Sequence, residues 1–102
     1  MESIHIAIMQ HYCIDECAHI EDKYICTIII NNTCTTGDGD NEIAAIIDAA
    51  SWGFSYGFAQ EIRKCKSIDD FLNLLKVKDF KVRHFYNPDL TIIEAEKNED
   101  HY

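Results

Sequence analysis

The chain has little of what marks repetitive or membrane proteins: it holds one proline and four glycines in 102 residues. This composition excludes a collagen-like or low-complexity chain. No apolar run approaches the roughly 18 residues that a membrane-spanning helix needs. The first residues lack the basic segment and the small-residue cleavage site of a secretory signal. We therefore expect a cytoplasmic protein that folds as one domain over residues 1–97, followed by a frayed acidic tail at 98–102.

Basic residues are almost missing from the first sixty positions, which hold nine acids and one base, Lys23. Residues 61–97 hold eight bases and seven acids, so the excess behind the net charge of -9 lies in the N-terminal part. A negative field repels nucleic-acid phosphates and attracts basic protein surfaces. We expect no direct binding to nucleic acid or membrane and a basic protein as the partner. The alternative is that the charge serves solubility alone.

Catalytic motifs are also missing. The sequence has no G-x-S-x-G, H-E-x-x-H, Walker A or G-x-G-x-x-G pattern. Its adjacent carboxylate pairs, such as Asp69 and Asp70, cannot face one pocket from consecutive positions. We therefore expect a protein that is not an enzyme and uses no cofactor.

Disulfide chemistry is not expected, because the five cysteines are odd in number and no secretion signal precedes them. One cluster could hold a metal ion, with the pattern H-x-C-x3-C-x-H formed by His11, Cys13, Cys17 and His19. If the chain reverses near Asp15, Cys13 faces Cys17 and His11 faces His19, and four zinc ligands converge. The reversal contains no glycine or asparagine, which disfavours a tight turn. We expect no bound metal, and a metal- or small-ligand-binding module stays as an alternative.

Alternating apolar residues predict four strands, at residues 3–9, 23–31, 80–86 and 90–96. The polar residues 10–22 between the first two are expected to form a long connection or a ragged hairpin. The run from Asn31 to Asp40 has loop chemistry and is expected to end at a helix N-cap at Asp40.

Apolar residues at three- and four-residue steps predict one long helix over residues 41–65. The glycines at 53 and 57 support an alternative in which this helix breaks near Gly53 and a second begins around Phe58. A capping box at Ser67 predicts a short helix that ends near Lys76. The order β-β-α-α-β-β predicts an α+β fold, with a mostly antiparallel sheet of about four strands and one long and one short helix on one face.

Candidate partner-binding residues are the N-terminal acids and two aromatic residues. The acids are Asp15, Glu16, Glu21, Asp22, Asp38, Asp40, Glu42 and Asp48. Trp52 and Tyr56 belong to a second apolar stripe of the predicted long helix, together with Ala45, Ala49 and Ala59. Tryptophan and tyrosine are enriched in interface hot spots, although core packing is the alternative role for both.

The sequence thus predicts a small acidic protein that binds and inhibits a basic partner, such as a nucleic-acid-handling enzyme. Its general profile is similar in kind to that of phage-encoded anti-CRISPR proteins and bacterial toxin-immunity proteins, with no residue-level match. A third function class is a self-associating structural protein. In that case a homodimer would pair through the second helix stripe or through the strand at 23–31, whose two faces are both apolar.

Overall fold

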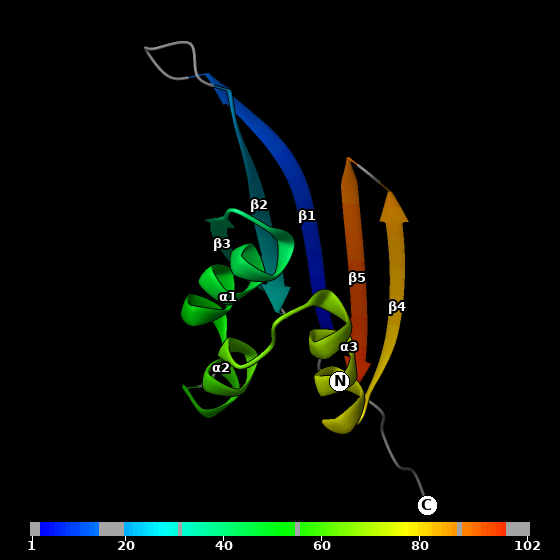
Figure 1. Cartoon of the computed structure of the whole chain (residues 1–102). Helices are drawn as coiled ribbons and strands as arrows, with labels where there is room; N and C mark the ends of the chain where they lie inside the picture. The colour runs from blue at the N-terminus through cyan, green and yellow to red at the C-terminus, as the bar shows by residue number, and fades with distance from the viewer. Residues whose placement is uncertain (1–2, 15–19, 31, 55, 88, 98–102) are drawn as a thin grey trace, which may run out of the picture.

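The computed structural model describes residues 3–14, 20–30, 32–54, 56–87 and 89–97. Five strands form one antiparallel sheet, and three helices lie against it (Figure 1). The elements in chain order are β1 (Ser3–Ile14), β2 (Ile20–Ile30), β3 (Thr33–Gly39), α1 (Glu42–Gly53), α2 (Tyr56–Arg63), α3 (Ile68–Val77), β4 (Phe80–Asn87) and β5 (Leu90–Lys97). The order across the sheet is β3-β2-β1-β5-β4. The predicted α+β class is confirmed. The sequence analysis expected four strands and two helices, whereas the structure has five strands and three helices in the described ranges.

The additional strand, β3, comes from the segment that the sequence analysis assigned to a loop. Its threonines are β-branched and suit an extended backbone. Its glycines are needed because α1 packs very close to this strand. A Cβ atom at Gly37 would lie 2.2 Å from the backbone nitrogen of Ala49, and one at Gly39 would lie 2.7 Å from that of Ala45. Residues that indicate a loop in sequence therefore allow a close contact between strand and helix.

The predicted long helix is two helices, as in the alternative that placed a break near Gly53. The backbone leaves the helical conformation at Phe54, whose N–H donates to the carbonyl of Ala50 at 3.1 Å. The phenyl rings of Phe54 and Phe58 pack edge to face across the break, with centroids 4.9 Å apart. Glycine disfavours a continuous helix here because of its low helix propensity.

The helix caps show one correction and one confirmation. The N-cap of α1 is Asn41 rather than Asp40, because the Asn41 side-chain oxygen accepts a hydrogen bond from the N–H of Ala44 at 2.8 Å. The predicted cap at Ser67 is confirmed, and its hydroxyl accepts from the N–H of Asp70 at 3.2 Å. Side-chain oxygens at both positions satisfy N–H groups that the first helical turn leaves unpaired.

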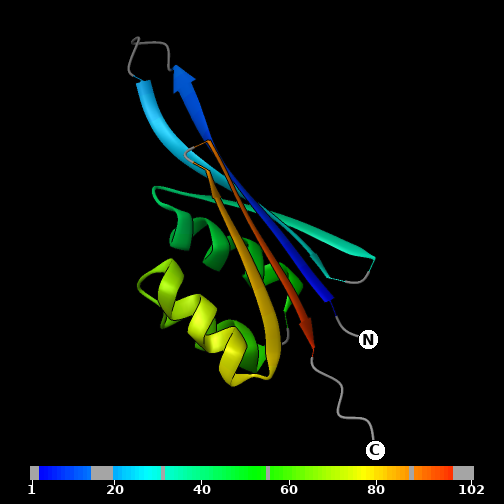
Figure 2. The same ribbon diagram turned by 90° about the vertical axis from the view of Figure 1, so that its right-hand side faces the viewer.

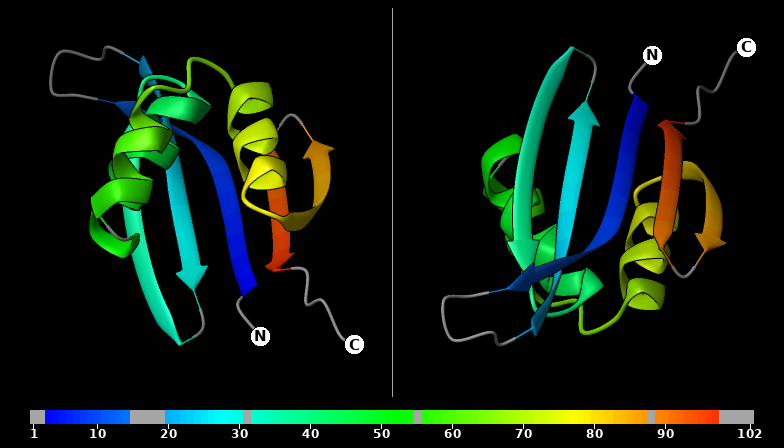
Figure 3. Two further views of the ribbon diagram at one scale, coloured as in Figure 1. Left: turned by 90° about the horizontal axis from the view of Figure 1, so that it is seen from below. Right: turned by 90° about the horizontal axis from the view of Figure 1, so that it is seen from above.

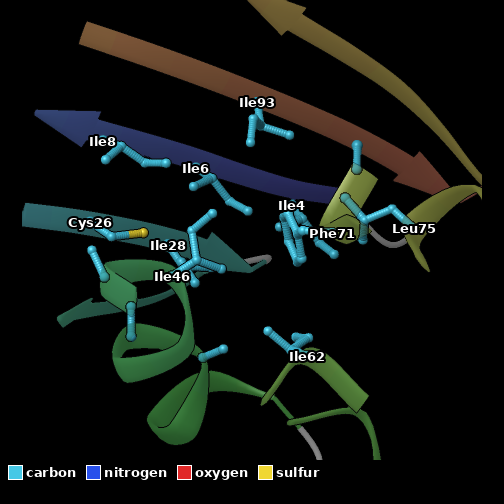
Figure 4. Packing of buried hydrophobic residues seen from close by; sticks show 14 of the residues in the cluster. Ile4, Ile6, Ile8, Cys26, Ile28, Ile46, Ile62, Phe71, Leu75 and Ile93 are labelled. Atoms are coloured by element: carbon cyan, nitrogen blue, oxygen red, sulfur yellow. The ribbon is translucent and has the colours of Figure 1, made fainter. Parts of the chain in front are cut away.

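All three helices lie on the same face of the sheet (Figures 2 and 3). The side chains between the two layers form the hydrophobic core, with isoleucines from β1, β2 and β5 packed against Ile46, Ile62, Phe71 and Leu75 of the helices (Figure 4). We call this side of the sheet the covered face. None of the helices in the described ranges is long and apolar enough to cross a membrane.

The opposite side of the sheet carries none of the helices of the described ranges, and we call it the open face (Figure 3, right). Alternate residues of each strand point to it, since successive side chains of a strand take opposite faces. Its exposed large apolar side chains are Met9, Ile25, Ile29, Phe85 and Leu90. The sheet therefore has one face in the core and one apolar face in solvent.

Candidate protein-binding surface

The strands β1 and β2 continue past their neighbours and form a two-stranded arm (Figure 1, top). β5 pairs with β1 only as far as Met9, and β3 pairs with β2 only from Tyr24 onward. The arm therefore consists of residues 10–14 and 20–23. Two predicted partner-binding residues, Glu21 and Asp22, are on the arm, opposite Cys13 and Tyr12. The side chains of Glu21 and Asp22 are outside the described part of the structure, as are Asp15 and Glu16 altogether.

The pairing of β1 with β2 differs from the pairing that the metal hypothesis required. His11 is opposite Lys23 and Cys13 is opposite Glu21, so the hairpin is centred two residues later than Asp15. The metal hypothesis required pairing of His11 and Cys13 with His19 and Cys17, which are outside the described residues. Within the described ranges, no group of three or more His, Cys, Asp and Glu side chains is placed to hold a metal ion.

The remaining predicted acids gather where β3 ends and α1 begins, at the base of the arm. Asp38 is opposite Ile25 of β2, three residues from Asp22 in the arm, and Asp40 and Glu42 follow at the turn into α1. We call the set Asp38, Asp40, Glu42, Asp48 and Trp52 the acidic corner. The fold thus brings the two acidic segments of the sequence to the same end of the molecule.

Asp48 has a structural role within the acidic corner. Its side-chain oxygen accepts a hydrogen bond from the backbone N–H of Asp38 at 3.0 Å. At the next residue of α1, the hydroxyl of Thr35 donates to the carbonyl of Ala49 at 3.1 Å. These bonds fasten α1 to β3 and satisfy an N–H at the edge of the sheet, where unpaired groups invite unwanted strand pairing.

Trp52 is 77% exposed, although its helical spacing grouped it with Ala45 and Ala49. The two alanines are buried against β3, but β3 is the edge strand, and no described residue covers Trp52 beyond it. The core role for Trp52 is therefore wrong. Ala59, from the same predicted stripe, is buried on α2. Tyr56 begins α2, and its side chain is outside the described part of the structure.

A hollow of about 310 Å³ lies against the acidic corner. Its lining residues include Asp38, Asp48 and Ile25. One basic group lies beside the residue before Trp52, where the Arg63 guanidinium is 3.4 Å from the hydroxyl of Ser51. The hollow combines negative charge with apolar surface, which suits the aliphatic stem and cationic end of a lysine or arginine.

The cysteines differ in environment. Cys26 is buried on the covered face, and this burial raises the pKa of its thiol to about 12. Burial also raises the pKa of the Cys65 thiol, with a further contribution from the nearby Asp70 carboxylate. Cys34 is exposed on β3, and all three of these cysteines are free thiols. A raised pKa lowers the thiolate fraction and so disfavours nucleophilic chemistry at Cys26 and Cys65.

Apart from Asp38, the sequence analysis named no single residue of the open face outside the arm as a binding residue, although it named the strand at 23–31 as a surface for self-association. The available signal was the strand at 23–31, where Ile25 and Ile29 alternate with apolar residues on the other face. Comparison of this chain with protein-family models, with curated proteins and with solved structures finds no match.

Proposed function

We propose that this chain is a cytoplasmic, non-enzymatic protein that binds its acidic corner to a basic surface of a partner protein and inhibits that partner. A nucleic-acid-handling enzyme fits this role, because its basic surface is shaped to bind phosphates and carboxylates can occupy it instead. The observation that carries the proposal is Trp52, which is 77% exposed one helical turn from Asp48.

The combination of an exposed tryptophan with the Asp48 carboxylate one helical turn away supports binding more than solubility does. Charge alone keeps a protein in solution, and an exposed indole works against that. Tryptophan is enriched among residues that dominate interface energies, while charges around it mainly speed association and select the partner. The acidic corner contains both kinds of group.

The position of the arm supports a second area of contact. It extends from the same end of the sheet as the acidic corner and carries Glu21 and Asp22 (Figure 1). Because the arm and the acidic corner share this end of the sheet, a partner that lies against the corner can also contact the arm.

Affinity capture from the native host tests the proposal. The bait proteins are the wild type, Trp52→Ala and Val77→Ala, with Val77 as the matched control because it is 80% exposed on α3. We expect the wild type and Val77→Ala to retain a basic, nucleic-acid-binding protein at low salt and to release it at high salt. We expect Trp52→Ala to lose about 2 kcal/mol of binding free energy or more, about thirtyfold in affinity, while its thermal unfolding stays cooperative.

Binding of the captured protein to the wild-type chain can be measured by titration, with the fluorescence of Trp52, the sole tryptophan of the chain, as the signal. A charge reversal, Asp40→Lys, should slow association, and Asp89→Lys in the β4–β5 connection is the matched control. Asp48 is not suitable for this test because its carboxylate fastens α1 to β3. The proposal is wrong if Trp52→Ala binds the captured protein as tightly as the wild type, or if association is equally fast at low and high salt.

A further inference from the structure

The open face of the sheet adjoins the acidic corner at Asp38 and Ile25, and the proposed function does not use the rest of it. Neighbouring strands place its residues in rows that run across the sheet. One row contains Ile25, Met9 and Leu90, and the next contains Thr27, Ala7, Ile92 and Phe85. Met9 and Phe85 are 56% and 55% exposed. These two rows form an apolar band across four of the five strands.

The charged residues beside the band are matched within the face. We consider only the rows to which at least three strands contribute. In these rows Glu94 is directly opposite Arg83, and Glu96 is directly opposite Lys81. The His5 Nδ1 atom is also 3.7 Å from a carboxylate oxygen of Glu94. With Asp38 at the rim, these rows hold three acids and two bases, whereas the whole chain carries a net charge of -9.

We propose that the open face binds the open face of a second copy of this chain, forming a symmetric dimer by sheet-on-sheet packing. A basic partner gains little on this face, because its acids already have basic neighbours. Two copies can meet here with little repulsion, whereas their acidic corners and arms would repel each other. The occupant that fits an apolar, nearly neutral face on an acidic protein is therefore the same face of another copy.

The shape and size of the band suit this contact. Ala7 and Thr27 are small and directly opposite each other, whereas Met9 and Ile25 in the next row are large. A low area therefore lies beside a raised one, and two such faces can fit together. Stacked sheets pack about 10 Å apart through side chains of this kind. The whole open face, with the charged rows beside the band, has five strands spaced about 4.8 Å apart and rows that span about 25 Å. It presents about 600 Å² per copy, so a dimer would bury about 1,200 Å². That value is at the lower limit for a stable interface, and we expect association in the micromolar range.

Sedimentation of the wild-type chain across a range of concentrations tests the dimer directly. We expect the mass to rise from 11.8 kDa to twice that value between about 1 and 100 µM. We expect Met9→Glu and Phe85→Glu to remain monomeric at 100 µM, because each places a charge in the apolar band. Val77→Glu is the control, since it makes the same change at an exposed apolar residue of α3 and should leave the dimer intact.

A second measurement does not depend on a destabilising substitution. Ala7→Cys adds one sulfur atom at the centre of the band, and its modification by a thiol reagent can be followed by peptide mass mapping. We expect the modification rate to fall at least tenfold as the concentration rises through the dimerisation range. The dimer is ruled out if the wild type stays at 11.8 kDa up to 500 µM, or if the Ala7→Cys thiol reacts equally fast at every concentration.

Discussion

The covered and open faces of the sheet are made from the same strands, yet they have different environments. Ile28 and Ile29 are consecutive in β2, and Ile28 is 0% exposed whereas Ile29 is 42% exposed. Cys26 is buried on the covered face, and Cys34 is exposed on β3. The difference arises because all three helices connect β3 to β4 on one side of the sheet. Residue type alone therefore does not define the core of this protein.

The largest expected difference between the two faces is in thiol reactivity. A pKa of about 12 leaves roughly one Cys26 thiol in ten thousand ionised at pH 8, and the side chain is also fully buried. We expect Cys34 to react with a thiol reagent at least about a thousandfold faster than Cys26 in the folded protein. Peptide mass mapping at increasing reaction times measures both rates, and denatured protein is the control in which they should converge. Similar rates in the folded protein would show that the covered face opens readily to solvent.

A smaller difference is expected in stability when the two isoleucines are truncated. Ile28→Ala removes a fully buried side chain and should lower the free energy of unfolding by about 3–4 kcal/mol. Ile29→Ala removes a side chain on the open face and should cost less than about 1 kcal/mol at concentrations where the chain is monomeric. Denaturant unfolding at low micromolar concentration measures both values. Equal losses would mean that the open face is covered in the monomer.

The smallest expected difference tests how closely α1 packs on the covered face. Gly37→Ala places a methyl group where the backbone of Ala49 lies, so α1 must shift, and we expect a loss of about 2 kcal/mol. Thr36→Ala changes the neighbouring position on the open face and should cost a few tenths of a kcal/mol. Thermal unfolding of the two variants compares them. A neutral or stabilising Gly37→Ala would indicate that α1 moves away from β3 without cost.

Several elements were predictable because their signals are local. The alternating isoleucines from Ile4 to Ile8 predicted β1, and Ser67 predicted the start of α3 through its own hydrogen bond to Asp70. The sequence analysis included a helix break near Gly53 as an alternative, because glycine disfavours helix regardless of the surrounding fold. In these cases the determining interactions are within a few residues of one another.

Other features depended on contacts between distant segments. The sequence of β3 is typical of a loop because it contains Gly37 and Gly39. These glycines are needed for the close packing of α1, which follows them in the chain. The metal hypothesis assumed a hairpin centred at Asp15, but the pairing with β2 places the centre two residues later. Trp52 has the helical spacing of a buried stripe and is exposed because α1 lies over an edge strand. A local sequence pattern does not indicate which strand lies at the edge of the sheet.

The sequence by itself determined the charge distribution, the α+β class, the strands at both ends of the chain and the cap of α3, because composition, periodicity and capping act within one segment. Tertiary structure alone decided that the acids of residues 21–22 and 38–48 meet at one end, that Trp52 faces solvent, and that one apolar face of the sheet is left open. These outcomes depend on the order of strands and on the side of the sheet that the helices cover. Alternation along a strand specifies two faces but not which of them will be buried.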